Sequence, residues 1–204
     1  MATSKSSRST KNSRPPTQTK NAGTAMLALL RGINVGGNKK VPMAELRSVA
    51  TTLGFTAVQT YIQSGNLVFG TTLTPVAAEA TLEQAIQAHF GFPVPVVCRT
   101  LTQWERYAQG SAFPDAETER PNLLHLGLAK STAIPGAAEA LARYATAGER
   151  FHLEGDTLWL DYVAGVARSK LTPVALDRAW GSIVTARNWN TVQALLPLLR
   201  EIRS

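Results

Sequence analysis

The chain has 204 residues, 44% of them hydrophobic, which suits one large domain or two small ones with a buried core. Its formal net charge is +7, but five basic and no acidic residues lie in positions 1–23, so positions 24–204 carry only +2. A single cysteine, Cys98, excludes an intrachain disulfide and a zinc site built on several thiolates. No apolar run approaches the roughly 18 residues of a membrane span, so we expect no membrane-spanning segment.

Residues 1–23 form a basic, serine-rich tail that has no large apolar residue after Met1. Such a segment cannot bury enough surface to offset the entropy lost on ordering, so we expect a disordered tail. It has no apolar h-region and is therefore not a secretory signal. Its charge leaves a targeting role or nucleic-acid binding as alternatives. The single free cysteine fits a reducing cytoplasm, where we expect the protein to act.

The residues after the tail predict the element order β-α-β-β-α-β, which is typical of a ferredoxin-like domain. Helices are expected where Pro42 and Pro75 precede apolar residues at helical spacing. Ser64-Gly65 predicts a two-residue hairpin turn, and a short extra helix from Thr102 should carry a capping box with Glu105. The expected strands are 25–33, 58–63, 66–70 and 94–100, and the expected helices are 42–53 and 75–90.

A polar segment bounded by prolines, 113–121, predicts a linker, and the same element order recurs after it. A final helix from about Trp189 should be bent by Pro197. The expected strands are 122–129, the two arms of a hairpin around Gly155-Asp156, and 182–186; the expected helices run from Pro135 to Tyr144 and from Thr172-Pro173 to about Gly181. The sequence thus predicts an α+β fold of two ferredoxin-like βαββαβ-type halves in tandem, 24–112 and 122–204, with a C-terminal helix. The halves share this order but no evident residue identity.

The loop "RGINVGGNKKVP" after the first strand looks at first like a phosphate-binding loop. It fails the Walker A pattern, because Asn38 and Lys39 occupy the positions that require lysine and a hydroxyl residue, and it also fails G-x-G-x-x-G. If Pro42 is the first helical residue, the N-cap is Val41, which has no side-chain acceptor. The first-turn N–H groups are then open to an anion. The alternative is a flexible loop with solvated lysines.

Three further stretches share the composition of this loop: "YIQSGNLVF", "GVARSKL" and "TARNWNTV". All are rich in hydrogen-bond donors and contain no Asp, His or Cys, so together they predict a site that attracts anions. The alternatives are ordinary turn residues, a solvated basic turn, and an N-cap for the last helix at Asn188 or Asn190. The candidate ligand-binding residues are Arg31, Asn34, Gly36, Gly37, Asn38, Lys39, Gln63, Ser64, Asn66, Arg168, Ser169, Lys170, Arg187, Asn188 and Asn190.

These stretches do not offer the residues that hydrolases and metalloenzymes use. They contain no paired carboxylates, metal ligands or Ser-His-Asp set, and the three histidines are scattered over a helix end and two strands. The sequence therefore predicts no metal and no cofactor, and it assigns no catalytic residue. Any reaction would depend on electrostatic stabilisation of an anion.

The same stretches resemble a bacterial family catalogued as domain of unknown function 1697. The segments that carry the resemblance are "LLRGINVGGNKKVPMAEL", "TYIQSGNLVF", "ARSKL" and "TARNWNTV", and it runs from about Ala25 to the C-terminus. The resemblance implies an α+β fold with ferredoxin-like subdomains. It implies no activity, so no catalytic residue can be carried over. The tail looks like an addition to the family pattern.

The leading functional hypothesis is a cytoplasmic binding protein for a small anionic ligand, phosphorylated or nucleotide-like. The alternatives are a nucleic-acid-binding module that uses the sheets and the basic tail, an enzyme acting on an anionic substrate, and a scaffold in which the motifs are only loop structure. The sequence predicts no membrane partner and no particular oligomeric state.

Overall fold

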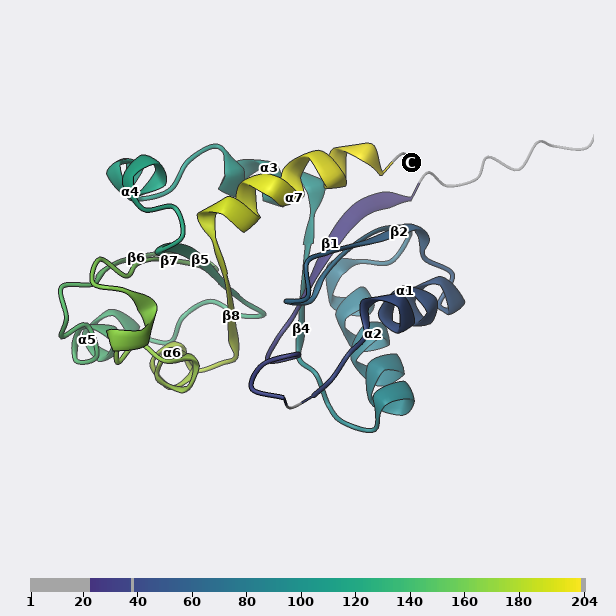
Figure 1. Ribbon diagram of the computed structural model, residues 1–204, viewed down its shortest axis with the longest axis horizontal. Coiled ribbons are helices and arrows are strands. Elements are labelled where there is room, and N and C mark those ends of the chain that lie inside the picture. Colours follow the sequence, from purple (N-terminus) through teal and green to yellow (C-terminus); the bar gives the residue numbers. More distant parts are fainter. Residues whose placement is uncertain (1–22, 38, 203–204) are drawn as a thin grey trace, which may run out of the picture.

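The computed structural model describes residues 23–37 and 39–202 (Figure 1). The predicted tail, apart from Gly23, and the candidate residue Asn38 lie outside the described residues. Among the described helices, none has the length and apolar character needed to cross a membrane.

The first half folds as a β-α-β-β-α-β unit consisting of β1 (Thr24–Leu30), α1 (Met43–Thr52), β2 (Thr56–Tyr61), β3 (Asn66–Thr71), α2 (Pro75–Phe90) and β4 (Val96–Thr100). Its four strands form a sheet in the order β2-β3-β1-β4, with all neighbours antiparallel. Alternate residues of a strand face opposite sides of the sheet. On one face, Met26, Ala28 and Leu30 of β1 pack in a core with residues of α1 and α2.

The second half repeats this order with β5 (Leu124–Ala129), α5 (Ala137–Ala142), β6 (Arg150–Glu154), β7 (Thr157–Asp161), the 3₁₀ turn η1 (Val166–Arg168), α6 (Pro173–Trp180) and β8 (Val184–Asn188). Its sheet has the corresponding order β6-β7-β5-β8, again with antiparallel neighbours. The predicted α+β fold of two βαββαβ-type halves in tandem is confirmed.

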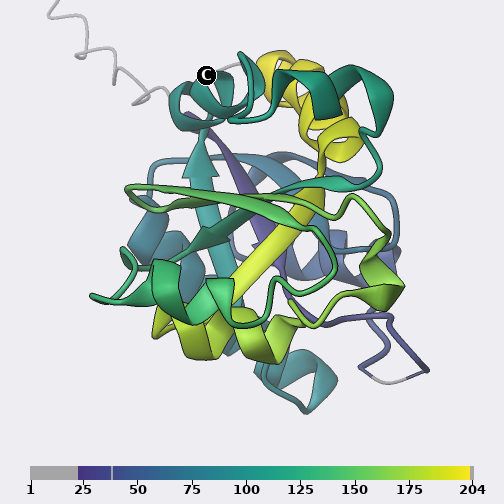
Figure 2. The ribbon, with the colours of Figure 1, turned by 90° about the vertical axis from the view of Figure 1, so that its left-hand side faces the viewer.

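A shared core joins the two halves. The helices α3 (Leu101–Ala108) and α7 (Trp189–Glu201) follow β4 and β8, and they lie together at one end of the molecule, across both sheets (Figures 1 and 2). Leu27 and Leu29, on the other face of β1, belong to the same core cluster as Leu126 of β5 and Trp189 of α7. The C-terminal helix is thus part of the junction between the halves, and the central strand β1 is buried on both faces.

Several predicted boundaries are wrong by a few residues, for local reasons. The N-cap of α1 is Pro42 rather than Val41, although the cap still makes no side-chain hydrogen bond. The β2–β3 turn has four residues, 62–65, instead of two. The capping box of α3 is formed by Thr100 and Gln103, because β4 turns directly into the helix. α5 begins only at Ala137, since the residue before it is a left-handed glycine.

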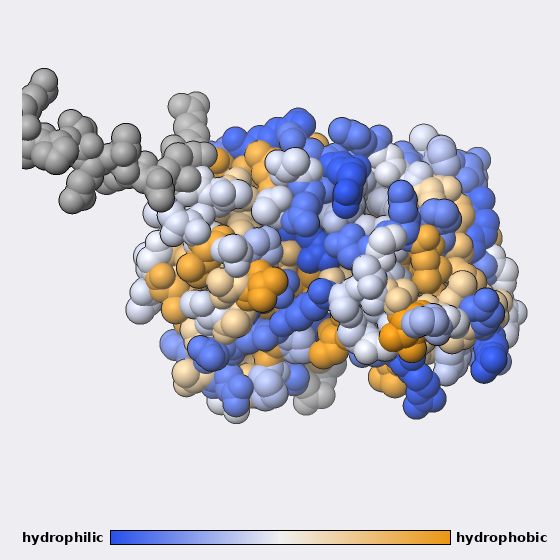
Figure 3. All heavy atoms as spheres, turned by 180° about the vertical axis from the view of Figure 1, so that it is seen from behind, coloured by the Kyte–Doolittle hydropathy of each residue, from blue (hydrophilic) through white to orange (hydrophobic). Residues whose placement is uncertain are grey.

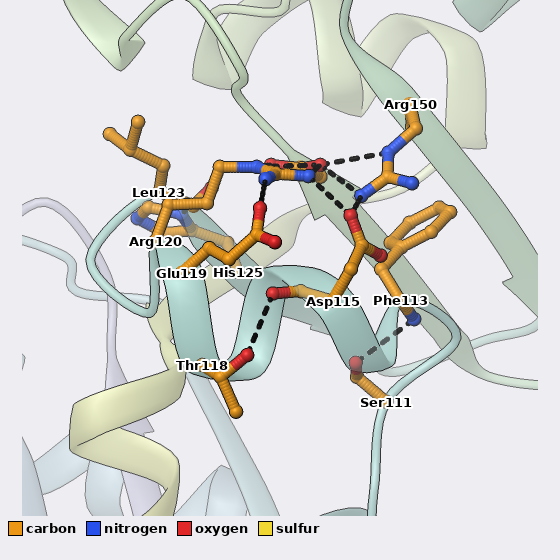
Figure 4. A network of polar contacts seen from close by, with 10 residues as sticks. Ser111, Phe113, Asp115, Thr118, Glu119, Arg120, Leu123, His125 and Arg150 are labelled. Atoms are coloured by element: carbon orange, nitrogen blue, oxygen red, sulfur yellow. Dashed lines mark hydrogen bonds and ion pairs between the residues drawn. The ribbon is translucent and has the colours of Figure 1, made fainter.

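The predicted linker contains a short helix, α4 (Pro114–Glu119), that is fixed to the second half. The side chain of Asp161 is completely buried and accepts hydrogen bonds from Arg120 and Arg150 at 2.6 to 3.2 Å. Both arginines also contact Asp115 of α4 at 2.7 Å (Figure 4). These charged pairs hold the 113–121 segment against the second sheet. The domain limits 24–112 and 122–204 stay a prediction.

Candidate functional site

Arg187 is the most buried of the predicted ligand-binding arginines. Its Nε donates to Oδ1 of Asn66 at 2.6 Å, and its terminal nitrogens donate to the carbonyls of Leu30, Ser64, Gly65 and Ala186 and to the Thr185 hydroxyl. Burial lowers the pKa of Arg187 to about 10. This value is still above neutral pH, so the guanidinium stays charged there. A guanidinium has five N–H donors, and these acceptors occupy them. Arg187 therefore ties β8 to the first half and has no donor left for a small ligand.

Arg31 also makes a contact between the halves. It directly follows β1, and its Nη1 donates to both carboxylate oxygens of Asp177 on α6, at 2.7 and 2.6 Å. Asp177 in turn accepts the backbone N–H of Val184, the first residue of β8. The arginine is thus neutralised within the protein.

The loop after β1 is closed by its own polar side chains. The Nδ2 of Asn34 donates to the carbonyls of Val41 and Gln63 at 3.0 and 2.9 Å, and its Oδ1 accepts the N–H of Val41. Lys39 donates to the Pro93 carbonyl at 2.9 Å. Gly36 and Gly37 are exposed at the tip of this loop. Through Asn34 and Arg187, three of the four predicted stretches come into contact: the loop, the β2–β3 turn and the end of β8.

The remaining candidates make local contacts or lie elsewhere. Asn188 caps α7 by accepting the Thr191 N–H at 3.0 Å, which confirms the structural alternative for this residue, and the Asn190 amide pairs with Asn122. The Ser169 hydroxyl donates to Glu149 and accepts the N–H of the residue two positions on. Arg168 and Lys170 are exposed, and within the described residues no hydrogen bond or ion pair connects them to the other three stretches.

A groove of about 540 Å³ lies where the two halves meet, beside the loop after β1. Lys39 donates to Pro93 in its wall, and the Arg31 N–H donates to the Pro95 carbonyl at 3.0 Å. Both halves contribute to the lining, which consists of Glu83, Gln87, Pro93, Val94, Pro95, Val97, Lys130, Ser182 and Ile183. Five of these residues are apolar, and of the polar ones Glu83 pairs with Lys130.

Lys130 crosses from the second half to two carboxylates of α2. Its Nζ lies 2.7 Å from Oε1 of Glu83 and 3.8 Å from Oε2 of Glu79. Glu79 is 5% exposed, and burial raises the pKa of its carboxyl. The two acids are four residues apart and so share one face of the helix. They accept the outward N–H groups of Val96 and Cys98 in the edge strand β4, both at 2.8 Å.

Sequence reasoning missed Glu79, Glu83 and Lys130, because it searched the donor-rich loops for a site. Two signals were present: a pair of acids at four-residue spacing in an apolar helix, and a lysine directly after a predicted strand. Neither signal names a partner, since Lys130 and Glu83 are 47 residues apart in the chain. The free thiol of Cys98 is buried in β4, as expected, and burial raises its pKa.

Comparison with known proteins agrees with the sequence motifs. Residues 24–159, more than half of the chain, match the model of a family described as protein of unknown function (DUF1697). The chain belongs to the DUF1697 family. The predicted resemblance to this family is therefore confirmed, and the matched residues contain the first two of the four motifs.

One solved structure similar to this DUF1697 chain is described as that of a conserved bacterial protein from Streptococcus pneumoniae. The two are 23% identical, with a TM-score of 0.63 over 86% of this chain and 98% of that one. At this identity the likeness shows the fold alone. No curated protein matches the chain.

Proposed function

We propose that this protein binds a small anionic ligand in the groove between its two halves, and that it does so in the cytoplasm. The observation that carries the proposal is the groove itself. Its volume of about 540 Å³ falls within the roughly 300–1,000 Å³ of small-molecule sites, and its walls combine apolar residues with a few polar groups, as such sites do. A ligand there would contact both halves at once.

Lys130 is the group best suited to hold the anion. An ammonium has three N–H donors, of which Glu83 takes one at 2.7 Å, while Glu79 at 3.8 Å lies beyond hydrogen-bonding distance. The Lys130 side chain is 40% exposed, so its remaining donors are accessible. Gln87 and Ser182 add an amide and a hydroxyl to the same lining.

This proposal keeps the class of ligand expected from the sequence but moves its site. Arg31 and Arg187 hold the halves together instead of facing the ligand. Lys39 stays beside the site through its contact with Pro93 in the groove wall.

The alternatives have less support from the described residues. RNA-recognition sheets use an open face with exposed aromatic residues, whereas Leu27 and Leu29 on β1 are buried in the shared core. For a scaffold we would expect a large apolar docking patch. On the face seen in Figure 3, apolar side chains lie in small separate groups among hydrophilic ones.

The test is a thermal-shift screen of the full chain with nucleotides, sugar phosphates and organic carboxylates, followed by calorimetry on any ligand that stabilises it. Ile183→Trp should block the groove and Lys130→Met should remove the ammonium, so both should abolish the shift. Val76→Trp, the same kind of enlargement at a position 74% exposed and outside the lining, is the matched control. Retained binding in both groove variants, or no response to any anion, would overturn the proposal.

A further inference from the structure

Two carboxyl groups lie beside the single ammonium of the groove before any ligand enters. Lys130 brings one positive charge, and Glu83, at 2.7 Å, brings one negative charge. Glu79 lies directly behind them, with Oε2 at 3.8 Å from the same ammonium. A ligand that bonds to Lys130 therefore meets one cation and two acids.

The two acids cannot simply turn away from the ligand. Glu83 holds the N–H of Val96 and Glu79 holds the N–H of Cys98, both at 2.8 Å. These N–H groups belong to the edge strand β4 and would otherwise lack partners, so moving either carboxylate would leave a donor of the strand unsatisfied. The negative charges are fixed parts of the groove.

This arrangement discriminates by charge. The donors of an ammonium point in tetrahedral directions, so an anion bonded to Lys130 lies roughly 4.5 Å from Oε1 of Glu83. The charge-assisted hydrogen bond to Lys130 stabilises one negative charge on the ligand, and repulsion from the two acids cancels most of the attraction that a further charge would gain. The cost of removing an ion from water, by contrast, grows with the square of its charge. A second negative charge thus adds cost and almost no attraction.

The apolar walls of the groove can contribute binding free energy that the charged groups do not. The first half contributes Pro93, Val94, Pro95 and Val97 to the lining, and the second half contributes Ile183. Ile183 is 41% exposed, so a ligand with an apolar body would cover it and gain roughly 25 cal/mol per Å² of buried apolar area.

Resting on the proposed function, we infer that the groove takes a singly charged anion with an apolar body, such as an aromatic or branched carboxylate, and rejects doubly charged phosphate groups. The residue that sets this preference is Glu83. It acts on the charge of the ligand and not on its shape.

Three probes with the same ring separate charge from shape: benzoate, benzenesulfonate and phenylphosphonate, measured by calorimetry on the full chain at mildly alkaline pH. The first two carry one charge, and the last carries two. Sulfonate and phosphonate are both tetrahedral. We expect the sulfonate to bind at least about tenfold more tightly than the phosphonate. In Glu83→Gln, whose amide oxygen still accepts the Val96 N–H, this ratio should fall several-fold.

Glu79→Gln provides a second variant, in which a smaller fall of the same ratio is expected because Glu79 is farther from Lys130. Glu105→Gln changes a partly exposed acid on α3 that pairs with Arg200, and this control should leave the ratio unchanged. Equal or tighter phosphonate binding in the native protein would overturn this inference while leaving the proposed function standing. If none of the probes bound, and Lys130→Met left the thermal shift with every anion of the screen unchanged, both proposals would fail together.

Discussion

The two halves carry an arginine at the same position of the same strand and satisfy it differently. Arg99 is the fourth residue of β4, and Arg187 is the fourth residue of β8. Each guanidinium donates to the carbonyl of the preceding residue and to the last carbonyl of the other half's first strand, that of Ala129 or Leu30. The halves therefore exchange arginines across their junction.

The partners at the hairpins differ. Arg99 meets a carboxylate, Asp156, at 2.9 Å in the β6–β7 turn, whereas Arg187 meets carbonyls and the Asn66 amide at the β2–β3 turn. Nε of Arg99 is buried without a hydrogen-bond partner among the described residues, while Nε of Arg187 donates at 2.6 Å. A carboxylate neutralises a buried cation but does not fill its donors. Several neutral acceptors do fill them, and they fix its position more completely.

A second exchanged pair differs in exposure between the two halves and lies beside the groove in one of its two positions. Arg31 follows β1 and reaches Asp177 on α6, and Lys130 follows β5 and reaches Glu83 on α2. Arg31 is 18% exposed and Lys130 is 40% exposed. α2 has 16 residues and α6 has eight, and the additional turns of α2 carry Glu83 and Gln87 into the groove. The candidate site therefore lies where the two halves differ, at the part of α2 that has no counterpart in α6.

The largest expected effect comes from removing the better satisfied arginine. Arg187→Met should lower the free energy of unfolding by roughly 3–5 kcal/mol, because buried acceptors such as the carbonyls of Leu30 and Ser64 lose their donor. Arg99→Met should cost less, about 1–3 kcal/mol, since Asp156 is 30% exposed and can be hydrated. Urea unfolding of both variants checks the order. A larger loss of unfolding free energy in Arg99→Met than in Arg187→Met would refute the view that Arg187 is the better satisfied arginine.

Substitutions in the two hairpins should also cost more stability in the first half than in the second, but less than loss of the arginines. Asn66→Ala removes an amide that accepts from Arg187 and donates to the Tyr61 carbonyl and the Ser64 hydroxyl, and should cost about 2 kcal/mol. Thr157 occupies the matching place at the start of β7, and its side chain donates one hydrogen bond, to the carbonyl of Glu154. Thr157→Val should therefore cost about 1 kcal/mol. Thermal unfolding of the two variants measures the difference, and equal costs would contradict it.

The exchanged ion pairs should differ less. Arg31→Ala should cost about 1 kcal/mol, because its contact with Asp177 involves both carboxylate oxygens and is mostly shielded from water. Lys130→Ala should cost below about 0.5 kcal/mol, as expected for an exposed pair. Double-mutant cycles with Asp177→Ala and Glu83→Ala give the two coupling energies. A larger coupling energy for Lys130–Glu83 than for Arg31–Asp177 would contradict the prediction that the more exposed pair contributes less stability.

The smallest effect should appear only at acid pH and only in the second half. Hydrogen bonds from Arg150 and Arg120 lower the pKa of Asp115 from its ordinary 3.8 to about 2. Since the folded pKa is the lower one, the stabilisation is complete above the ordinary value and is lost as the pH falls through about 2. We expect the Asp115→Asn variant to lose less stability than the native protein over this range in pH-dependent thermal melts. If the melting temperatures of the variant and the native protein fell equally with pH, the contacts of Asp115 with Arg120 and Arg150 would not make stability depend on pH.

Local sequence determined the order of the elements and many of their ends. Thr74 and Thr172 cap α2 and α6, each followed by a first-turn proline, and Gly91 and Gly181 end these helices in the left-handed conformation. These signals act within one turn of the chain, so they can be read without the fold. The family, too, was predicted from short sequence motifs, and the match over residues 24–159 confirms it.

Tertiary structure alone decided which polar groups face a ligand and which hold the protein together. Arg187 and Asn66 are 121 residues apart in the chain, and Lys130 and Glu83 are 47 apart, so no local pattern pairs them. A donor-rich loop looks the same in sequence whether its donors meet a ligand or the carbonyls of another strand. The physical reason is that a buried donor without an acceptor costs free energy, and only the packing of the two halves determines which acceptor a donor meets.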